Sequence, residues 1–191
     1  MPSLIGSLSK LLELDLDNNK LTSLPSPIGS LSNLLELDLN NNKLTSLPES
    51  IGSLYNLQYL DLSNNNLTSI PESIQSLSNL QRLFLAHNNL KSLPNQVGNL
   101  SNLEYLYLYN NKLTSLPNPI EILIKKEKIC LILNESSYEI NNLSMDCHTL
   151  ILTDIDNNVI NLPLNLKTLY LKSDIDVDMI KLPYGCDIIR F

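Results

Sequence analysis

The sequence has few of the residues that build catalytic or metal centres. Its 191 residues include two histidines, five glycines and three cysteines, and no cysteine pair has CxxC or CxC spacing. A zinc site needs four ligands at suitable spacing, and phosphate binding by a P-loop needs a glycine-rich turn. Cys147 and His148 are adjacent, which on a strand places them on opposite faces and argues against a nucleophile pair. We therefore expect no enzyme activity, no metal and no cofactor.

Positive charge is also scarce. The sequence has thirteen Lys and Arg residues and twenty Asp and Glu residues, which gives a net charge of −7. Nucleic-acid partners and electrostatic membrane anchoring both need clustered cations, so we expect neither. No apolar run approaches the ~20 residues of a membrane helix. Residues 1–16 carry early acidic residues instead of a signal peptide, so we expect a cytoplasmic protein with reduced thiols.

Leucine, by contrast, recurs at a fixed period. The string L-x-x-L-x-L-x-x-N-x-L-x-x-L-P-x-x-I-x-x-L occurs five times at a constant spacing, with Ile or Val at a few aliphatic positions. The copies begin at Leu11, Leu34, Leu57, Leu80 and Leu103, which defines a 23-residue period. Such a period predicts a stack of similar coils. In the second copy, Leu37 and Leu39 alternate as in a strand, whereas Pro48 and Ile51 predict a bend and a short helical or 3₁₀ segment.

An asparagine recurs shortly after the last strand leucine, where the chain leaves the strand. Its amide can donate to and accept from backbone groups that would otherwise be buried without partners. We expect these asparagines to form a ladder that joins each coil to the next. The predicted ladder consists of Asn19, Asn42, Asn65, Asn88, Asn111 and Asn134.

The repeat resembles that of the leucine-rich repeat family, in particular the 23-residue intracellular class with Leu-Pro in its second half, over residues 1–124. The resemblance implies an α/β solenoid curved like a horseshoe. A parallel β-sheet would line its concave face, and short helical or 3₁₀ segments its convex face. Residues 162–171 resemble the shorter FNIP-type repeats of amoebae and of DNA viruses that infect them, although the Phe-Asn-x-Pro part is missing.

The spacing of the leucines divides the chain into two parts. Residues 1–134 are predicted to form regular coils, starting with an uncapped half repeat at 1–10, and Leu131 keeps the 23-residue register of Leu108. Residues 135–191 have shorter and irregular 19- or 20-residue units, in which Ile189 is expected to occupy the strand position of Leu169. We expect one solenoid of about nine strands that residues 135–191 extend and cap. A separate small C-terminal domain is the alternative.

Residues between the inward leucines are predicted to face the concave surface. Aromatic residues and an adjacent arginine are typical of binding hot spots. The predicted partner-binding residues are Tyr59, Arg82, Phe84, His87, Tyr105, Tyr107 and Tyr109. A secondary acidic strip consists of Glu13, Asp15, Asp17, Glu36, Asp38 and Asp61. The alternatives are that the rings only stabilise the sheet and that the acids form a solvated face.

We therefore expect a non-catalytic module that binds a protein partner on its concave face. One alternative is the substrate-recognition part of a ubiquitin-ligase system, since relatives in the family fuse such repeats to ligase domains. Another is a structural protein that self-assembles, or a homodimer, through the uncapped N-terminal edge. Two acidic runs, residues 154–158 and 174–178, lack the glycine and the final glutamate of a calcium loop, so we expect them to be turns.

Overall fold

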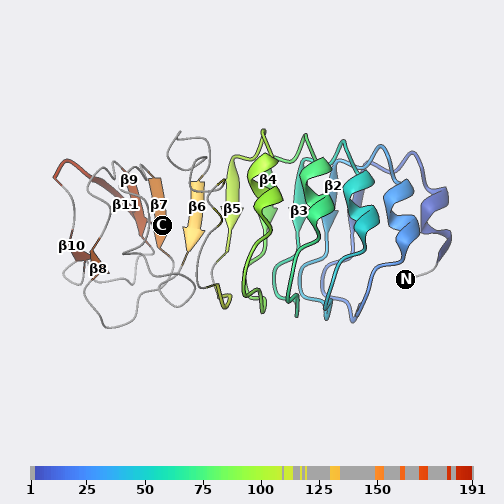
Figure 1. Ribbon diagram of the computed structural model, residues 1–191, viewed down its shortest axis with the longest axis horizontal. Coiled ribbons are helices and arrows are strands. Elements are labelled where there is room, and N and C mark those ends of the chain that lie inside the picture. Colours follow the sequence, from blue (N-terminus) through green and yellow to red (C-terminus); the bar gives the residue numbers. More distant parts are fainter. Residues whose placement is uncertain are drawn as a thin grey trace.

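A computed structural model shows the chain as an elongated stack of coils (Figure 1). It describes residues 3–108, 110–113, 117, 119, 130–133, 149–152, 160–161, 168–171, 180–181 and 184–190. Each of the first five coils has a short strand, and a short 3₁₀ helix separates each of these strands from the next. The strands are β1 (Glu13–Asp15), β2 (Glu36–Asp38), β3 (Tyr59–Asp61), β4 (Arg82–Phe84) and β5 (Tyr105–Tyr107). The 3₁₀ helices are η1 (Ser3–Ser7), η2 (Ser26–Ser30), η3 (Glu49–Ser53), η4 (Glu72–Ser76) and η5 (Asn95–Asn99).

The strands alternate between buried and exposed positions. In β4, Leu83 is fully buried, while Arg82 is exposed and Phe84 is half-buried on the other face. In β5, Leu106 is fully buried and Tyr107 is half-buried. The expectation that leucines point inward, and that Tyr107 lies on the open face of the sheet, is therefore confirmed.

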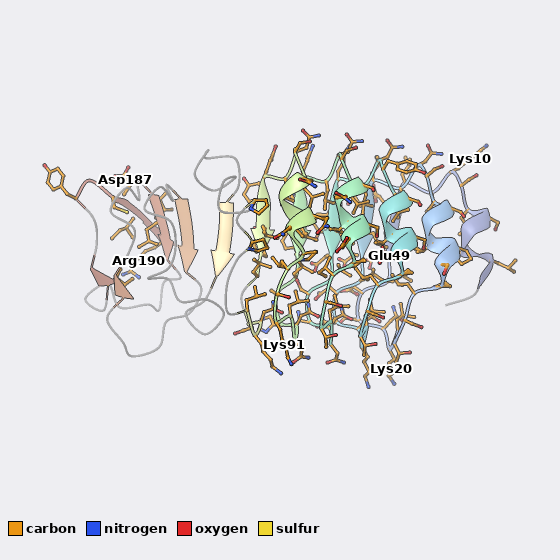
Figure 2. The ribbon with its side chains drawn as sticks, in the orientation of Figure 1. Lys10, Lys20, Glu49, Lys91, Asp187 and Arg190 are labelled. Atoms are coloured by element: carbon orange, nitrogen blue, oxygen red, sulfur yellow. The ribbon has the colours of Figure 1, made fainter. Side chains whose placement is uncertain are left out.

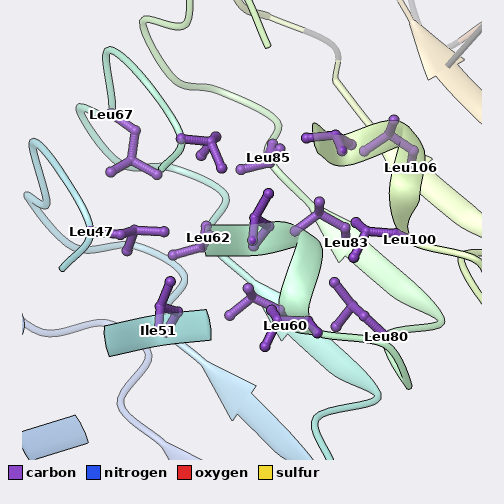
Figure 3. Close-up of a cluster of buried hydrophobic side chains, with 14 of the residues drawn as sticks. Leu47, Ile51, Leu60, Leu62, Leu67, Leu80, Leu83, Leu85, Leu100 and Leu106 are labelled. Atoms are coloured by element: carbon purple, nitrogen blue, oxygen red, sulfur yellow. The ribbon is translucent and has the colours of Figure 1, made fainter. Parts of the chain in front are cut away.

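The 3₁₀ helices begin where proline bends the chain away from the sheet. Pro48 precedes η3 with φ −71° and ψ 148°, an extended conformation that suits its ring. Ile51 of η3 is fully buried, and its carbonyl accepts a hydrogen bond from the Leu54 amide. Figure 3 shows how leucines from strands and loops of successive coils, together with Ile51 of η3, meet in one continuous core.

The sheet is parallel throughout and contains nine strands among the described residues, in the order β1-β2-β3-β4-β5-β6-β7-β9-β11. The later strands are β6 (Cys130–Leu133), β7 (Thr149–Leu152), β9 (Thr168–Leu171) and β11 (Asp187–Arg190). β8 (Ile160–Asn161) and β10 (Ile180–Lys181) pair with each other in a second parallel sheet. No helix among the described residues is long and apolar enough to cross a membrane.

Two register predictions for the last coils are wrong. The repeat places Leu131 at the position of Leu108, but Leu131 pairs with Leu106. Asn134, the last asparagine of the predicted ladder, lies outside the described residues. At the end of the chain Leu169 pairs with Ile188 instead of Ile189.

The coils from β6 onward are shorter than the first five. Leu131 pairs with Leu150, and Leu150 pairs in turn with Leu169. These spacings are those of the 19-residue units that the sequence predicts after residue 134. The later strands therefore continue the same sheet with less chain in each coil.

The recurring asparagines join consecutive coils by hydrogen bonds. The Asn65 amide nitrogen donates to the carbonyls of Leu62 and Ser63 in its own turn and of Leu39 in the preceding coil. Its Oδ1 accepts a hydrogen bond from the Leu44 amide at 2.9 Å. Asn42, Asn88 and Asn111 are also buried and bridge two coils in the same way. Asn19 is exposed, and its amide nitrogen donates to two carbonyls of its own turn.

A candidate protein-binding face

Outward side chains of β1–β5 form two columns that run across the strands. Because the strands are parallel and in register, the first residue of each strand lies beside the first residue of the next. The first column is Glu13, Glu36, Tyr59, Arg82 and Tyr105. The second column, from the third residue of each strand, is Asp15, Asp38, Asp61, Phe84 and Tyr107. Carboxylates thus occupy the β1–β2 end of the face, and aromatic rings the β4–β5 end.

Three of the predicted partner-binding residues form a continuous row of rings. The ring centres of Tyr59 and Phe84 are 5.1 Å apart with a tilt of 44°, and those of Phe84 and Tyr107 are 4.2 Å apart and stacked. All three side chains are half-buried. The row lies diagonally on the face, because Tyr59 belongs to the first column and the other two rings to the second. It offers a flat apolar surface over three strands.

A fourth ring carries a cation beside it. The Arg82 guanidinium carbon lies 5.9 Å from the centre of the Tyr105 ring, within the range of a cation–π contact. Both side chains are exposed, and Tyr105 has 37% of its surface accessible. Arg82 is the one cationic residue in the two columns. The aromatic half of the face is therefore also its positive half.

His87 lies in a turn that follows β4. Its φ is 53°, and Asn18, Asn41, Asn64 and Asn110 have the same left-handed conformation in the other coils. Asparagine and histidine are enriched in this region of backbone space. The Asn110 amide nitrogen lies 3.0 Å from the His87 Nδ1. The repeat pattern predicts a concave-face position for His87 but does not show this backbone role. Tyr109 lies outside the described residues.

The aspartates of the acidic strip have a structural role through one oxygen each. Oδ1 of Asp15, Asp38 and Asp61 accepts a hydrogen bond from the backbone amide two residues later, at 2.8–2.9 Å. This turn ends each strand. Asp17 has a different partner, since its Oδ2 accepts from the Asn18 side chain. The second oxygens of Asp15 and Asp38, and both oxygens of Glu13 and Glu36, have no such partner among the described residues.

Residues of the acidic strip and the predicted partner-binding residue Tyr59 line one hollow of about 230 Å³. It is lined by Glu13, Leu14, Asp15, Glu36, Asp38 and Tyr59. Burial raises the pKa of Asp38, and the charges of Asp61, Asp15 and Asp17 add to this effect, against a backbone hydrogen bond from Asn40 that lowers the pKa. Burial and the carboxylates of Asp61, Asp38 and Glu36 raise the pKa of Tyr59 to about 12. The hollow is thus a site of unrelieved negative charge.

The Tyr59 side chain connects the two halves of the face. Its hydroxyl donates a long hydrogen bond of 3.4 Å to Oδ2 of Asp61, while its ring contacts Phe84. From the sequence, Tyr59 is predicted only as a member of the aromatic group. The side-chain direction that places it in the acidic hollow was not visible in the repeat. Among the described residues, no group of three His, Cys, Asp or Glu side chains is placed to hold a metal ion.

A second ladder of asparagines was missed in the sequence. Asn56 donates from its amide nitrogen to the Ser32 carbonyl of the preceding coil at 2.8 Å. Asn33, Asn79 and Asn102 make the equivalent hydrogen bonds to Ser9, Tyr55 and Ser78. The signal was present, because these four asparagines also recur with the 23-residue period. These bonds fix the loops between the 3₁₀ helices and the strands.

Three solved structures resemble the chain over most of its length. A leucine-rich repeat protein of Leptospira interrogans has 30% identity and a TM-score of 0.73, over 98% of this chain and 52% of its own. The plant peptide hormone receptor RGFR1, in complex with RGF2, has 31% identity and a TM-score of 0.69, over 90% of this chain and 30% of its own. The ectodomain of the Arabidopsis thaliana receptor kinase GASSHO1/SCHENGEN3, in complex with CASPARIAN STRIP INTEGRITY FACTOR 2, has 28% identity and a TM-score of 0.71. The match covers 100% of this chain and 23% of the ectodomain chain.

The chain spans about half of the first of these proteins and less than a third of the other two. A comparison with curated proteins gives no match. Models of two repeat families match the sequence: a leucine-rich repeat region over residues 49–146, and the leucine-rich repeat over residues 10–31 and 33–54. This fold suggests a module for protein–protein interaction. The chain belongs to the leucine-rich repeat family.

Proposed function

We propose that the protein is a non-catalytic module that binds a protein partner on its concave face. The contact zone is Tyr59, Arg82, Phe84, His87, Tyr105 and Tyr107, together with Tyr109. The observation that carries the proposal is the row of half-buried rings from Tyr59 to Tyr107 on the open face of the sheet. Aromatic rings on a rigid surface lose little conformational entropy on binding, and they dominate interface energetics.

Two relatives support a protein or peptide ligand. One is a peptide hormone receptor solved with RGF2, and the other is a receptor ectodomain solved with CASPARIAN STRIP INTEGRITY FACTOR 2. The rigidity of the coils supports the same interpretation, because buried asparagines join each coil to the next. A preformed surface avoids much of the ordering cost of binding.

Photo-crosslinking tests the location of the contact. The residue p-benzoylphenylalanine would replace Tyr107 in one variant and the exposed Gln75 of η4 in a matched control. We expect irradiation in extract of the source cells to give a discrete protein adduct from position 107 and none from position 75. The additional change Phe84→Ala is expected to abolish the adduct. Equal adducts from both positions, or an adduct at 107 that survives Phe84→Ala, would contradict the proposal.

Self-association through the N-terminal edge is a second candidate. Leu4, Leu8 and Leu12 are exposed there, Leu4 to 76%. A hollow of about 470 Å³ beside them is lined by residues 7–11. Light scattering over a range of concentrations tests this candidate, with Leu8→Glu as the variant expected to dissociate the dimer. A wild-type protein that stays monomeric at the highest concentration rejects it.

We also propose that the repeats are of the intracellular 23-residue class and that residues 162–171 are FNIP-like. A cytoplasmic location and a viral or amoebal source are further predictions. The role in a ubiquitin-ligase system has no further support from the residues described. The wrong register of Leu131 and Ile189 leaves the contact zone unaffected, because all of its described residues precede β6.

A further inference from the structure

The concave face changes chemical character at β3 in both columns. Glu13 and Glu36 precede Tyr59 in the first column, whereas Asp15, Asp38 and Asp61 precede Phe84 in the second. The change happens along the axis of the stack, from one coil to the next. A ligand that lies along a single strand would meet only one kind of side chain. A ligand that crosses the strands would meet first carboxylates and then rings.

The acidic half has no internal compensation among the described residues. None of the six carboxylates of the acidic strip forms an ion pair there. Like charges face each other directly across the strands, Glu13 beside Glu36 and Asp15 beside Asp38, an arrangement that destabilises a sheet. Figure 2 shows Lys20 and Lys91 pointing away from the coils along one edge. The hollow between these carboxylates has room for a side chain that brings positive charge.

The aromatic half suits a different side chain. The stacked rings of Phe84 and Tyr107 offer apolar surface, and Arg82 beside Tyr105 makes this half unfavourable for a second cation. A basic group is therefore attracted to the β1–β3 end and repelled from the β4–β5 end. The same gradient favours apolar or aromatic groups over β3–β5. The face thus discriminates between the two ends of a ligand.

The dimensions fit an extended chain. Neighbouring strands are ~4.8 Å apart, so β1 and β5 are separated by roughly 19 Å along the stack. An extended peptide advances ~3.3 Å per residue, so about six residues cover this distance. Their alternate side chains would point at the face about every 6.6 Å, roughly one and a half strand spacings.

Resting on the proposed function, we infer that the partner presents an extended segment of about six residues, with lysine or arginine at one end and apolar side chains at the other. The segment crosses β1 to β5, with its basic end in the hollow of Glu13, Glu36 and Asp38. Its apolar end lies on Phe84 and Tyr107. Charge complementarity at the hollow sets the direction in which the segment lies.

Selection from a random peptide display library tests this inference on the whole chain. The wild-type protein is expected to enrich peptides with basic residues at one end and apolar residues at the other. Glu13→Gln combined with Glu36→Gln is expected to abolish the basic bias of the selected peptides. For a synthetic peptide selected on the wild-type protein, this double variant is expected to bind about fivefold or more weakly. The matched control is Glu49→Gln combined with Glu72→Gln, which changes the net charge equally on the exposed 3₁₀ helices and is expected to leave binding unchanged.

The outcomes separate this inference from the function on which it rests. The inference is overturned if the selected peptides have no basic bias. It is also overturned if Phe84→Ala abolishes peptide binding while the Glu13 and Glu36 changes leave it intact, a result that keeps the concave face as the binding site. Peptides insensitive to both sets of changes overturn both. If no peptide is enriched, the extended-segment inference fails, and the crosslink at position 107 decides the function separately. Circular dichroism of every variant shows that the coils are intact.

Discussion

In β1 to β5 the inward residue is leucine in every strand, whereas the outward residues change from carboxylates to rings. The inward residues are Leu14, Leu37, Leu60, Leu83 and Leu106. Each of the three central leucines packs between equivalent leucines of the coils before and after it, so its surroundings repeat. Outward residues have open space on one side, and the stack does not dictate their chemistry. One side of each strand therefore determines the stability of the solenoid, while the other is free to determine what it recognises.

Removing an inward leucine gives the largest expected loss of stability. Leu60→Ala leaves a cavity between β2 and β4, and we expect the free energy of unfolding to fall by about 2–5 kcal/mol. Tyr59→Phe is the control in the same strand, since it removes only an outward hydroxyl with a long hydrogen bond to Asp61. Urea denaturation followed by circular dichroism measures both. Equal losses in the two variants would contradict the division between the two sides.

Removing one buried asparagine from the ladder that contains Asn65 is expected to give the next largest loss of stability. Asn65→Ala removes three donated hydrogen bonds and one accepted hydrogen bond within the interior. Leaving such groups unpaired costs about 1–3 kcal/mol. Asn19→Ala is the matched control, because Asn19 holds the same repeat position but is exposed and bonds within its own turn. A loss at Asn19 as large as that at Asn65 would show that bridging between coils is not the cause.

The convex side offers a third test, at the contact between 3₁₀ helices. A Cβ added at Gly52 in η3 would clash with the Ser73 carbonyl oxygen in η4. Gly52→Ala therefore forces neighbouring coils apart, and we expect a cost of about 1–3 kcal/mol. The equivalent position in the next coil already holds a larger residue, Gln75. Gln75→Ala is accordingly the control, with an expected change within about 0.5 kcal/mol in thermal or urea unfolding. A Gly52→Ala protein as stable as wild type would show that the helices can separate freely.

The repeat was sufficient to predict the interior of the first five coils. Leucine, asparagine and proline recur there with the 23-residue period, and each position has one physical role that its residue type indicates. The later register was less determined. Ile129, Leu131 and Leu133 alternate, so a shift by two positions keeps the same side chains on the same face. Ile188 and Ile189 are identical, so the sequence pattern does not distinguish which of them pairs with Leu169.

The candidate site was predicted in its composition but not in its arrangement. Period and alternation place Tyr59, Phe84 and Tyr107 on one face. They do not give the direction in which each side chain leans, and this direction brings Tyr59 to Asp61 and into the acidic hollow. The left-handed turn at His87 depends on local backbone geometry that four asparagines at the equivalent positions indicate. Such details depend on contacts between coils, which a single repeat does not contain.

The smallest expected effect is a gain in stability from the outward side. Asp38→Asn keeps an Oδ1 acceptor for the Asn40 amide and removes a charge that faces Asp15 and Asp61. Like charges directly opposite each other destabilise a sheet, and we expect the variant to be more stable at neutral pH by about 0.2–1 kcal/mol. An inward change such as Leu60→Ala is thus expected to destabilise the protein, whereas this outward change is expected to stabilise it.

The pH dependence gives the cause of this gain. Burial and neighbouring carboxylates raise the pKa of Asp38 above its ordinary value of 3.8, so folding favours the protonated carboxyl. The contribution of such a group to stability is complete below the unfolded-state pKa and is lost as the pH rises through the folded-state pKa. The advantage of Asp38→Asn should therefore be absent in acid and appear as the pH rises from 3.8 through the raised value. Urea unfolding of both proteins across this range measures it, with Glu49→Gln on η3 as the control for a change in net charge. An advantage that is the same at every pH would mean that repulsion among the carboxylates is not its source, and the hollow would then have no unrelieved charge to attract a basic partner.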